Sequence, residues 1–264
     1  MKIINKLFIA AAVVATLSGC GAAEELSEFY KLNACKDWSL KMEDSCRENW
    51  QEQWFMDGLI ATVTHSKDGM DFRAGETYGD DAHHAVLWTK EEFAGDVKIE
   101  YNYTRTEEQT VNVNILYIQA QGTGLNGTGT DISKWKRDVP TMKIYYEYMN
   151  PLHISYAAFP MVNEDPKNDY LRVRKYPISE KIDFDQMEVE PTFYNIELFK
   201  PYVTYKITVI KTQEKLFMNV EGDGREECYE WSLEGKASIN NGRIGLRHMY
   251  TRAAQYSDFK VYTK

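Results

Sequence analysis

Cysteine and histidine are scarce in this chain of 264 residues, which contains four cysteines and five histidines. They do not recur in pairs at the spacings of zinc ligands, so we expect no metal site. The glycine-rich stretch from Gln121 to Gly129 lacks the lysine and the following helix of a phosphate-binding loop. We therefore interpret this stretch as a plain loop and predict that the protein uses no cofactor.

Positive charge is also in the minority, since 31 lysines and arginines face 40 aspartates and glutamates, for a net charge of −9 at pH 7. Binding to nucleic acid needs a basic stripe, so we do not expect a nucleic-acid partner. A local basic groove is enough to bind an anionic glycan. The charge balance therefore leaves that class of partner open.

Long apolar runs are missing beyond the first residues. The run from Leu7 to Val14 follows two lysines and is too short for a stable membrane span. The next segment, Leu17-Ser-Gly-Cys20, resembles the lipobox of bacterial lipoproteins, in which cleavage precedes an acylated cysteine. We expect residues 1–19 to be a signal peptide and Cys20 to carry a lipid anchor. The expected location is the outer membrane, if the source has two membranes, or the cell surface or periplasm. The alternative is an ordinary signal peptide with a chance cysteine.

The exported part divides into a tether and one large domain. Residues 20–49 begin small and acidic, and we expect them to tether residues 50–264, a length that suits a single all-β domain. Cys35 and Cys46 enclose a short segment that we expect to be a loop before the first strand. In an oxidising compartment these two cysteines could form a disulfide, which would leave Cys228 unpaired.

Many short strands are predicted, and no long segment has a helical period. Residues 97–104 alternate well, with Val97, Ile99, Tyr101 and Tyr103 on one face. Further strands are expected at residues 59–64, 85–88, 111–118, 142–148, 152–156, 203–210, 215–220 and 227–233. Residues 160–200 are rich in proline and charge and are expected to be long loops. This pattern predicts an antiparallel sandwich or jelly roll.

The end of the chain gives a more specific indication of the fold. Residues 242–248 and 256–262 have the pattern of two adjacent strands that close a concanavalin-like β-sandwich. The predicted fold is therefore all-β, a concanavalin-like jelly roll of two antiparallel sheets. Proteins with this fold mostly handle glycans, although a fold alone does not specify a reaction.

Two histidines and two tyrosines are candidates for acid–base chemistry. His84 begins a strand and His153 lies in another; either imidazole could act as a base, with Tyr156 or Tyr146 as the acid. In a straight strand, His153 shares a face with Ser155 and not with Tyr156, so a site with Tyr156 would need a bulge. The alternative for each histidine is a structural role in a hydrogen-bonded position.

Basic and aromatic side chains could bind the substrate. Arg172 and Arg174 share a face if residues 170–176 are extended, and guanidinium groups bind carboxylate or sulfate with two hydrogen bonds. Salt bridges to surface carboxylates are the alternative. We predict that six residues bind substrate: Arg172, Arg174, Arg247, Trp88, Asn112 and Gln119.

Several segments together resemble a known family. They are His84 to Trp88, Ala120 to Gly122, His153 to Tyr156, Leu171 to Lys175 and Ile244 to Arg247. This set is similar to the YesU-like bacterial family of unknown function, in the concanavalin A-like lectin and glucanase superfamily. The resemblance covers most of residues 50–262. It implies a jelly roll and an association with the use of rhamnose-containing and uronic acid glycans.

Three functions remain open from the sequence. The first is a lipoprotein enzyme that cleaves a uronate-containing, and in some cases sulfated, polysaccharide or oligosaccharide by β-elimination, as a lyase or dehydratase. The second is a surface lipoprotein that binds an anionic glycan without catalysis. The third is a glycoside hydrolase that uses carboxylates such as Asp185 and Glu188, although Asp183 to Glu188 departs from the family 16 pattern in its first residue.

Overall fold

The computed structural model describes residues 28–125, 127–161, 165–179 and 181–264. The predicted signal peptide and Cys20 lie outside these residues. None of the described helices is long and apolar enough to cross a membrane. In the part of the chain that the structure describes, helical structure is limited to residues 28–33, one further α-helix and five short 3-10 helices: α2 (Met142–Tyr148), η1 (Trp50–Glu52), η2 (Asp81–His83), η3 (Ile132–Lys134), η4 (Pro166–Asn168) and η5 (Asp185–Met187).

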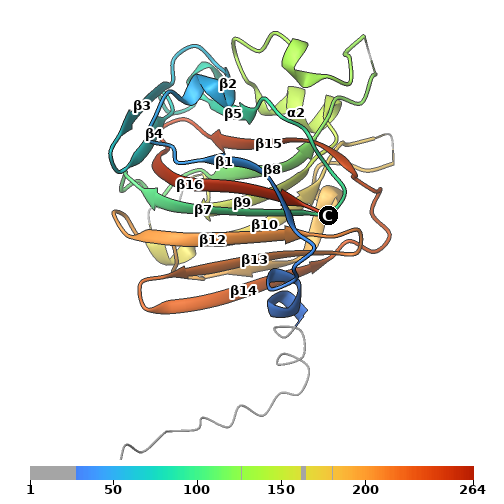
Figure 1. Cartoon of the computed structure of the whole chain (residues 1–264). Coiled ribbons are helices and arrows are strands. Elements are labelled where there is room, and N and C mark those ends of the chain that lie inside the picture. Colours follow the sequence, from blue (N-terminus) through green and yellow to red (C-terminus); the bar gives the residue numbers. More distant parts are fainter. Residues whose placement is uncertain (1–27, 126, 162–164, 180) are drawn as a thin grey trace, which may run out of the picture.

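Two antiparallel sheets form the protein (Figure 1). The first sheet has the order β14-β13-β12-β7-β16-β4-β3, with β1 paired to β16. Its strands are β14 (Arg225–Ser232), β13 (Lys215–Gly222), β12 (Thr204–Lys211), β7 (Val97–Arg105), β16 (Ala253–Thr263), β4 (Gly69–Arg73), β3 (Thr62–Ser66) and β1 (Ser39–Asp44).

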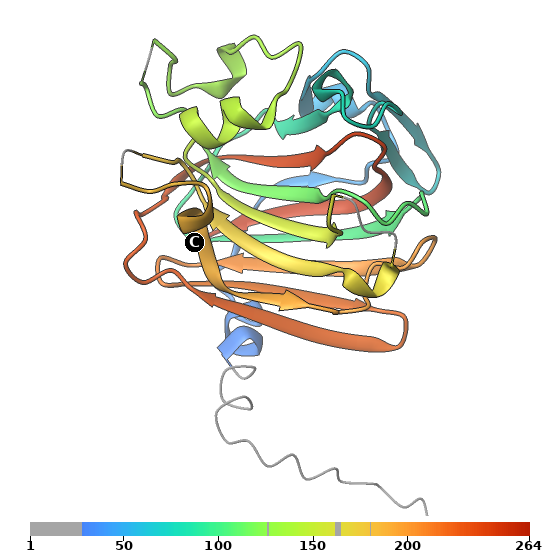
Figure 2. The ribbon, with the colours of Figure 1, turned by 180° about the vertical axis from the view of Figure 1, so that it is seen from behind.

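The second sheet has the order β11-β10-β9-β8-β15-β5-β2, with β6 paired to β15. Its strands are β11 (Glu188–Tyr194), β10 (Tyr170–Lys175), β9 (Leu152–Ala158), β8 (Asn114–Ala120), β15 (Asn241–His248), β5 (Ala85–Thr89), β2 (Trp54–Asp57) and β6 (Phe93–Ala94). The all-β sandwich of two antiparallel sheets is therefore confirmed. Figure 2 views the molecule from behind, with β9, β10 and β11 in front.

The main core fills the space between the two sheets. The alternation predicted for β7 is confirmed, because Val97, Ile99, Tyr101 and Tyr103 are all buried in this core. His248 is also buried here, and its ring stacks on Phe72, with 4.2 Å between ring centroids. Apolar faces from both sheets thus bury each other, which is the main source of stability of a sandwich.

The two final strands are consecutive in the chain, but they are not neighbours in a sheet. β15 pairs with β5 and β8 in the second sheet, whereas β16 pairs with β4 and β7 in the first. The predicted adjacency is therefore wrong. The link between them crosses the end of the sandwich, where the buried guanidinium of Arg252 donates hydrogen bonds to the carbonyls of Gln109 and Ala157.

Two further predictions of local structure are corrected. Residues 142–148 form α2 and not a strand, because Met142, Tyr145 and Met149 recur at helical spacing and pack on the second sheet. Residues 160–200 contain β10 and β11 in addition to loops.

The predicted disulfide is absent, since Cys35, Cys46 and Cys228 are all free. The segment between Cys35 and Cys46 is not a loop but contains the extended strand β1. Six extended residues span about 20 Å. A disulfide needs Cα atoms about 4–7 Å apart, so β1 separates the two thiols.

Candidate functional site

The outer face of the second sheet carries two rows of side chains that come from five neighbouring strands. The strand register sets residues of β5, β15, β8, β9 and β10 side by side. The first row is Val86, Arg247, Ile115, Ser155 and Arg172. The second row is Trp88, Gly245, Tyr117, His153 and Arg174. The sequence-predicted arginines and His153 are thus brought onto one face.

Helix α2 closes over part of this face. The rings of Trp88 and Tyr117 stack with 5.3 Å between centroids, and Tyr145 of α2 stacks on Tyr117 at 5.8 Å. Gly245 makes room for this stack, because a Cβ atom there would lie 2.4 Å from the Trp88 ring. Trp88 is therefore fully buried, and its predicted role in substrate contact does not fit this position.

His84 and Arg247 form a buried pair at the edge of the covered region. Arg247 Nη2 lies 2.9 Å from His84 Nδ1 and donates to the carbonyl of Pro140 at 2.7 Å. Burial, followed by the charge of Arg247, lowers the pKa of His84 to about 3. His84 is therefore neutral at physiological pH and holds Arg247, whose guanidinium also lies 4.6 Å from the ring centroid of Tyr145.

His153 is held on both sides of its ring. Nδ1 lies 2.7 Å from the Tyr176 hydroxyl and Nε2 lies 2.7 Å from Ser155 Oγ, so the shared face of His153 and Ser155 is confirmed. Burial, with Arg174 as the next cause, lowers the pKa of His153 well below its usual value. This ring is neutral, but only 2% of its residue surface is exposed. The His153 ring is available to a reactant only if α2, which closes over part of this face, moves away.

Buried positive charge on this face has few acidic partners. Among the described residues, neither Arg174 nor Arg247 forms an ion pair, and Arg174 Nε and Arg247 Nη1 have no hydrogen-bond partner. Arg174 instead lies over the ring of Phe184, with its Cζ atom 4.7 Å from the centroid. Buried cations usually have a counter-charge. The outer face is therefore electrostatically suited to an anion.

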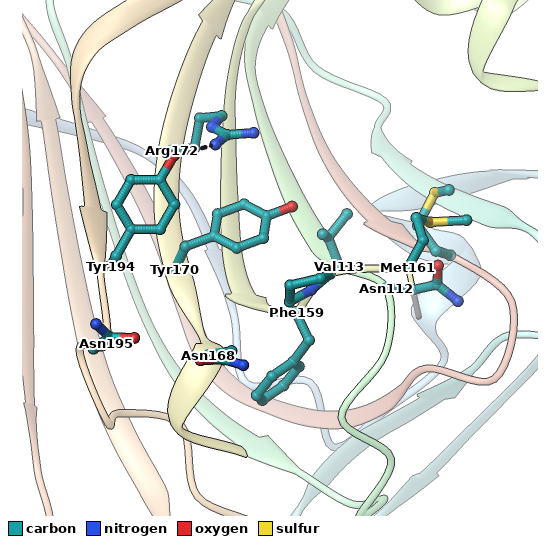
Figure 3. A pocket seen from close by; sticks show the side chains of 11 residues that line it. Asn112, Val113, Phe159, Met161, Asn168, Tyr170, Arg172, Tyr194 and Asn195 are labelled. Carbon is teal, nitrogen blue, oxygen red and sulfur yellow. Dashed lines mark hydrogen bonds between the residues drawn. The ribbon is translucent and has the colours of Figure 1, made fainter. Parts of the chain in front are cut away.

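An open cavity of about 610 Å³ lies where the first row reaches β10 (Figure 3). Arg172 lies beside two neighbouring rings in this cavity, with Cζ 4.8 Å from the centroid of Tyr170 and 5.9 Å from that of Tyr194. Arg172 Nε pairs with Glu188 at 3.0 Å, and Nη2 donates to the Tyr194 hydroxyl at 2.8 Å. Three amide side chains also line the cavity: Asn112, Asn168 and Asn195.

Asn112 is another residue that lines the cavity. Its backbone has φ +65°, a left-handed conformation that asparagine tolerates better than most residues. The side chain is buried, and its Oδ1 atom has no hydrogen-bond partner. Buried acceptors are rarely left without a partner, and a ligand could reach this one only if the cavity wall moved.

The opposite wall depends on a carboxylate that organises a turn. The buried side chain of Asp169 accepts backbone N–H bonds from Glu197 at 3.1 Å and from Leu198 at 3.3 Å. Asn195 donates its own N–H to the Asp169 carbonyl at 2.8 Å. These bonds hold the chain beyond β11 against β10 and so fix Asn195 beside the cavity.

Three other predicted site residues point elsewhere. Tyr156 lies in the main core, where its hydroxyl is 3.2 Å from that of Tyr256, because a regular strand puts it on the face opposite His153. Gln119 is buried and donates to the carbonyls of Phe93 and Gly95, so it fixes β6. Tyr146 is half-buried and packs edge-on against Phe184. These three residues do not line the cavity.

The sequence analysis missed the aromatic walls of the cavity. Tyr170 and Tyr194 are direct cross-strand partners on β10 and β11, which had been assigned to loops. The useful signal was the alternation of Tyr170, Arg172 and Arg174 along one strand. Among the residues that the structure describes, no group of three or more histidine, cysteine or acidic side chains could hold a metal ion.

Solved structures with similar folds are lectin-like. A protein of unknown function with a galectin-like fold from Bacillus subtilis is 19% identical, with a TM-score of 0.61 over 86% of this chain and 98% of that chain. The lectin UEA-II in complex with galactose is 7% identical, with a TM-score of 0.55 over 86% and 100% of the two chains. A legume lectin-like domain from Entamoeba histolytica is 11% identical, with a TM-score of 0.53 over 84% and 97%.

These likenesses show the fold, which agrees with the predicted concanavalin-like sandwich. No curated protein matches the chain. A family match covers almost all of the sandwich, from residue 45 to residue 261. The chain therefore belongs to the family described as a domain of unknown function, DUF1961.

Proposed function

We propose that the protein binds an acidic glycan, with one sugar ring in the open cavity against Tyr170, Tyr194 and Arg172. The observation that carries this proposal is the position of the Arg172 guanidinium beside two neighbouring tyrosine rings in a cavity of about 610 Å³. This volume is within the usual range for small-ligand sites.

The chemistry of the cavity matches the parts of a uronic acid. Tyr194 is 60% exposed, and a flat ring of this kind stacks on the apolar face of a sugar. The amides of Asn112, Asn168 and Asn195 suit hydroxyl groups. Glu188 and Thr192 occupy the Nε edge of Arg172, which leaves Nη1 to bind a sugar carboxylate or sulfate.

The fold context agrees with glycan binding, since the similar lectin UEA-II was solved with galactose. The resemblance to the YesU-like family supports a uronate-containing or rhamnose-rich glycan as the target. Lipid attachment at Cys20 would place such a receptor at a membrane surface. The glycan, the lipid anchor and the outer-membrane location are parts of this proposal.

Titration calorimetry with galacturonate oligosaccharides tests the binding proposal, with neutral galactose oligosaccharides of equal length for comparison. Loss of a charged hydrogen bond costs about 1.5–3 kcal/mol, so Arg172→Met should weaken binding by about 10- to 100-fold. Arg47→Met is a matched control, because Arg47 is also paired with a carboxylate, Asp258, but lies outside the cavity. Equal affinity of the Arg172 variant and the wild type would contradict the proposal.

A second candidate is β-elimination on the same glycan, as a lyase or dehydratase. It is favoured by one observation: the neutral His153 ring is hydrogen-bonded to Tyr176 and lies beside Arg174 in the strand register. These are the base, acid and carboxylate partner that this chemistry requires. Because His153 is buried, α2 and the residues packed around it would have to move away from this face before a substrate could reach the ring.

Absorbance of unsaturated uronate products separates the two candidates. An active lyase should lose this absorbance in His153→Gln and keep it in His65→Gln, because His65 is exposed on β3 of the other sheet. Tight binding of the oligosaccharide by the wild-type protein without product formation would leave only the binding function.

A further inference from the structure

Two buried lysines line one small cavity at the end of the sandwich away from the glycan cavity. Lys175 is the last residue of β10 in the second sheet, and Lys211 is the last residue of β12 in the first. Lys175 is 8% exposed and Lys211 is 1% exposed. Both line one small cavity, and Lys236 lines it as a half-buried third lysine.

The partners of these ammonium groups are neutral oxygen atoms. Lys175 donates to the side-chain amide of Asn150 and to the carbonyl of Tyr176, and Lys211 donates to the carbonyl of Ile239. Across the described ranges, neither lysine forms an ion pair. Each ammonium has three N–H donors. One donor of Lys175 and two of Lys211 are therefore left without a protein acceptor among these bonds.

Positive charge at this position is poorly compensated. Burial lowers the pKa of Lys175 to about 8, and it lowers the pKa of Lys211 to about 8 despite the attraction of Asp96. Buried charges in proteins are normally paired with an opposite charge. The environment of the two lysines therefore favours a small negative ion between them.

The size of the cavity limits the ion. Its volume of about 10 Å³ is at the lower limit for one buried water molecule, so only a single-atom anion could enter it. A sugar or a carboxylate-bearing ligand is too large, and a water molecule would fill the space without balancing the charge. We propose that Lys175, Lys211 and Lys236 hold one chloride-sized anion that ties together the ends of the two sheets.

Thermal unfolding of the full chain tests this site. Chloride and gluconate salts are compared at constant ionic strength, because gluconate is too large for the cavity. An anion that binds only the folded state stabilises it by mass action. We expect the melting temperature to rise by about 2–4 °C when 100 mM gluconate is replaced by chloride. Equal melting temperatures in the two salts would overturn the proposal.

Substitutions at the lysines separate anion binding from a packing role. Lys175→Met and Lys211→Met keep much of the side-chain volume but remove the charge, so each should abolish the difference between chloride and gluconate. Lys206→Met is the matched control, since Lys206 is exposed on the same strand as Lys211 and should keep the full difference. A chloride effect that persists in both buried variants would refute the site.

Bromide provides a direct readout that does not depend on the variants folding well. Crystals of the wild-type protein grown in bromide should show an anomalous peak between the Nζ atoms of Lys175 and Lys211. The absence of this peak at high occupancy of other bromide sites would also overturn the inference. Because the cavity is separate from Arg172, glycan binding can fail while this anion site stands.

Discussion

Asp57 offers the sharpest test of how the outer face is closed. It is the last residue of β2 and is 4% exposed. Its Oδ2 atom accepts three hydrogen bonds, from Trp88 Nε1 at 2.6 Å, Arg137 Nε at 2.5 Å and the Tyr145 hydroxyl at 2.8 Å. One carboxylate therefore connects β2, β5 and the covering segment that contains α2.

The expected cost of removing this carboxylate follows from burial. Arg137 is 5% exposed, so Asp57→Ala would leave a buried guanidinium without its ion pair. Breaking one side of a buried ion pair costs about 3–5 kcal/mol. The indole and phenol donors also lose their acceptor, which places Asp57→Ala towards the upper end of this range. Asp57→Asn keeps an oxygen acceptor and should cost less.

Urea unfolding measures this effect. With a slope near 3 kcal/mol/M, a loss of about 3–5 kcal/mol lowers the midpoint by about 1–2 M. Asp138→Asn is the matched control, because Asp138 forms a surface pair with Lys136 at 3.0 Å that should contribute less than about 1 kcal/mol. Trypsin should also cleave faster in residues 132–145 of the Asp57→Ala variant. A midpoint equal to that of the control would refute the role of Asp57.

Two further predictions concern pH and packing. The pKa of both His84 and His248 is about 3, chiefly through burial, against about 6.5 when unfolded. Stability is therefore complete above pH 6.5 and should fall by about 1.4 kcal/mol per histidine per pH unit below it. His248→Gln should remove the share of His248 from this dependence of the urea midpoint on pH. A flat wild-type profile would contradict the prediction. Gly245→Ala, which crowds Trp88, should cost about 1–3 kcal/mol in urea unfolding, unlike Gly129→Ala, whose Cβ meets nothing nearer than 4.0 Å.

Prediction from the sequence alone was most reliable for strands that bury one face in the main core. β7 alternates because its apolar side chains meet the second sheet, and β12 and β13, both predicted as strands, pair antiparallel. The strand predicted for residues 142–148 was wrong, because a segment of mixed aromatic and charged residues fits both the strand period and the helix period. Tyr145 of this segment packs on Trp88 and Tyr117, and this packing favours the helix. These contacts join residues that are distant in the sequence, so the local pattern does not reveal them.

The candidate site was predictable in part. Arg172 and Asn112 were identified and line the cavity. Tyr194 was missed because β11 contains Pro191 and acidic residues, which suggested a loop. β11 is an edge strand, where proline and charge are tolerated because one side of the strand has no neighbour. Edge strands therefore often lack regular alternation, and binding residues on them are missed when strands are predicted from alternation.

The segment that contains α2 covers part of the outer face and so determines which arginine can contact a ligand. Arg247 is fully buried beside Tyr145, and Arg174 is 8% exposed beside Phe184, so neither reaches solvent freely. Arg172 lies on the same face but beyond the cover, in the open cavity. The buried arginines still raise the positive potential of the face, since a charge in a low-dielectric environment is weakly screened. In the proposed complex, Arg172 would contact the acidic sugar while the other two arginines increase its attraction to the cavity.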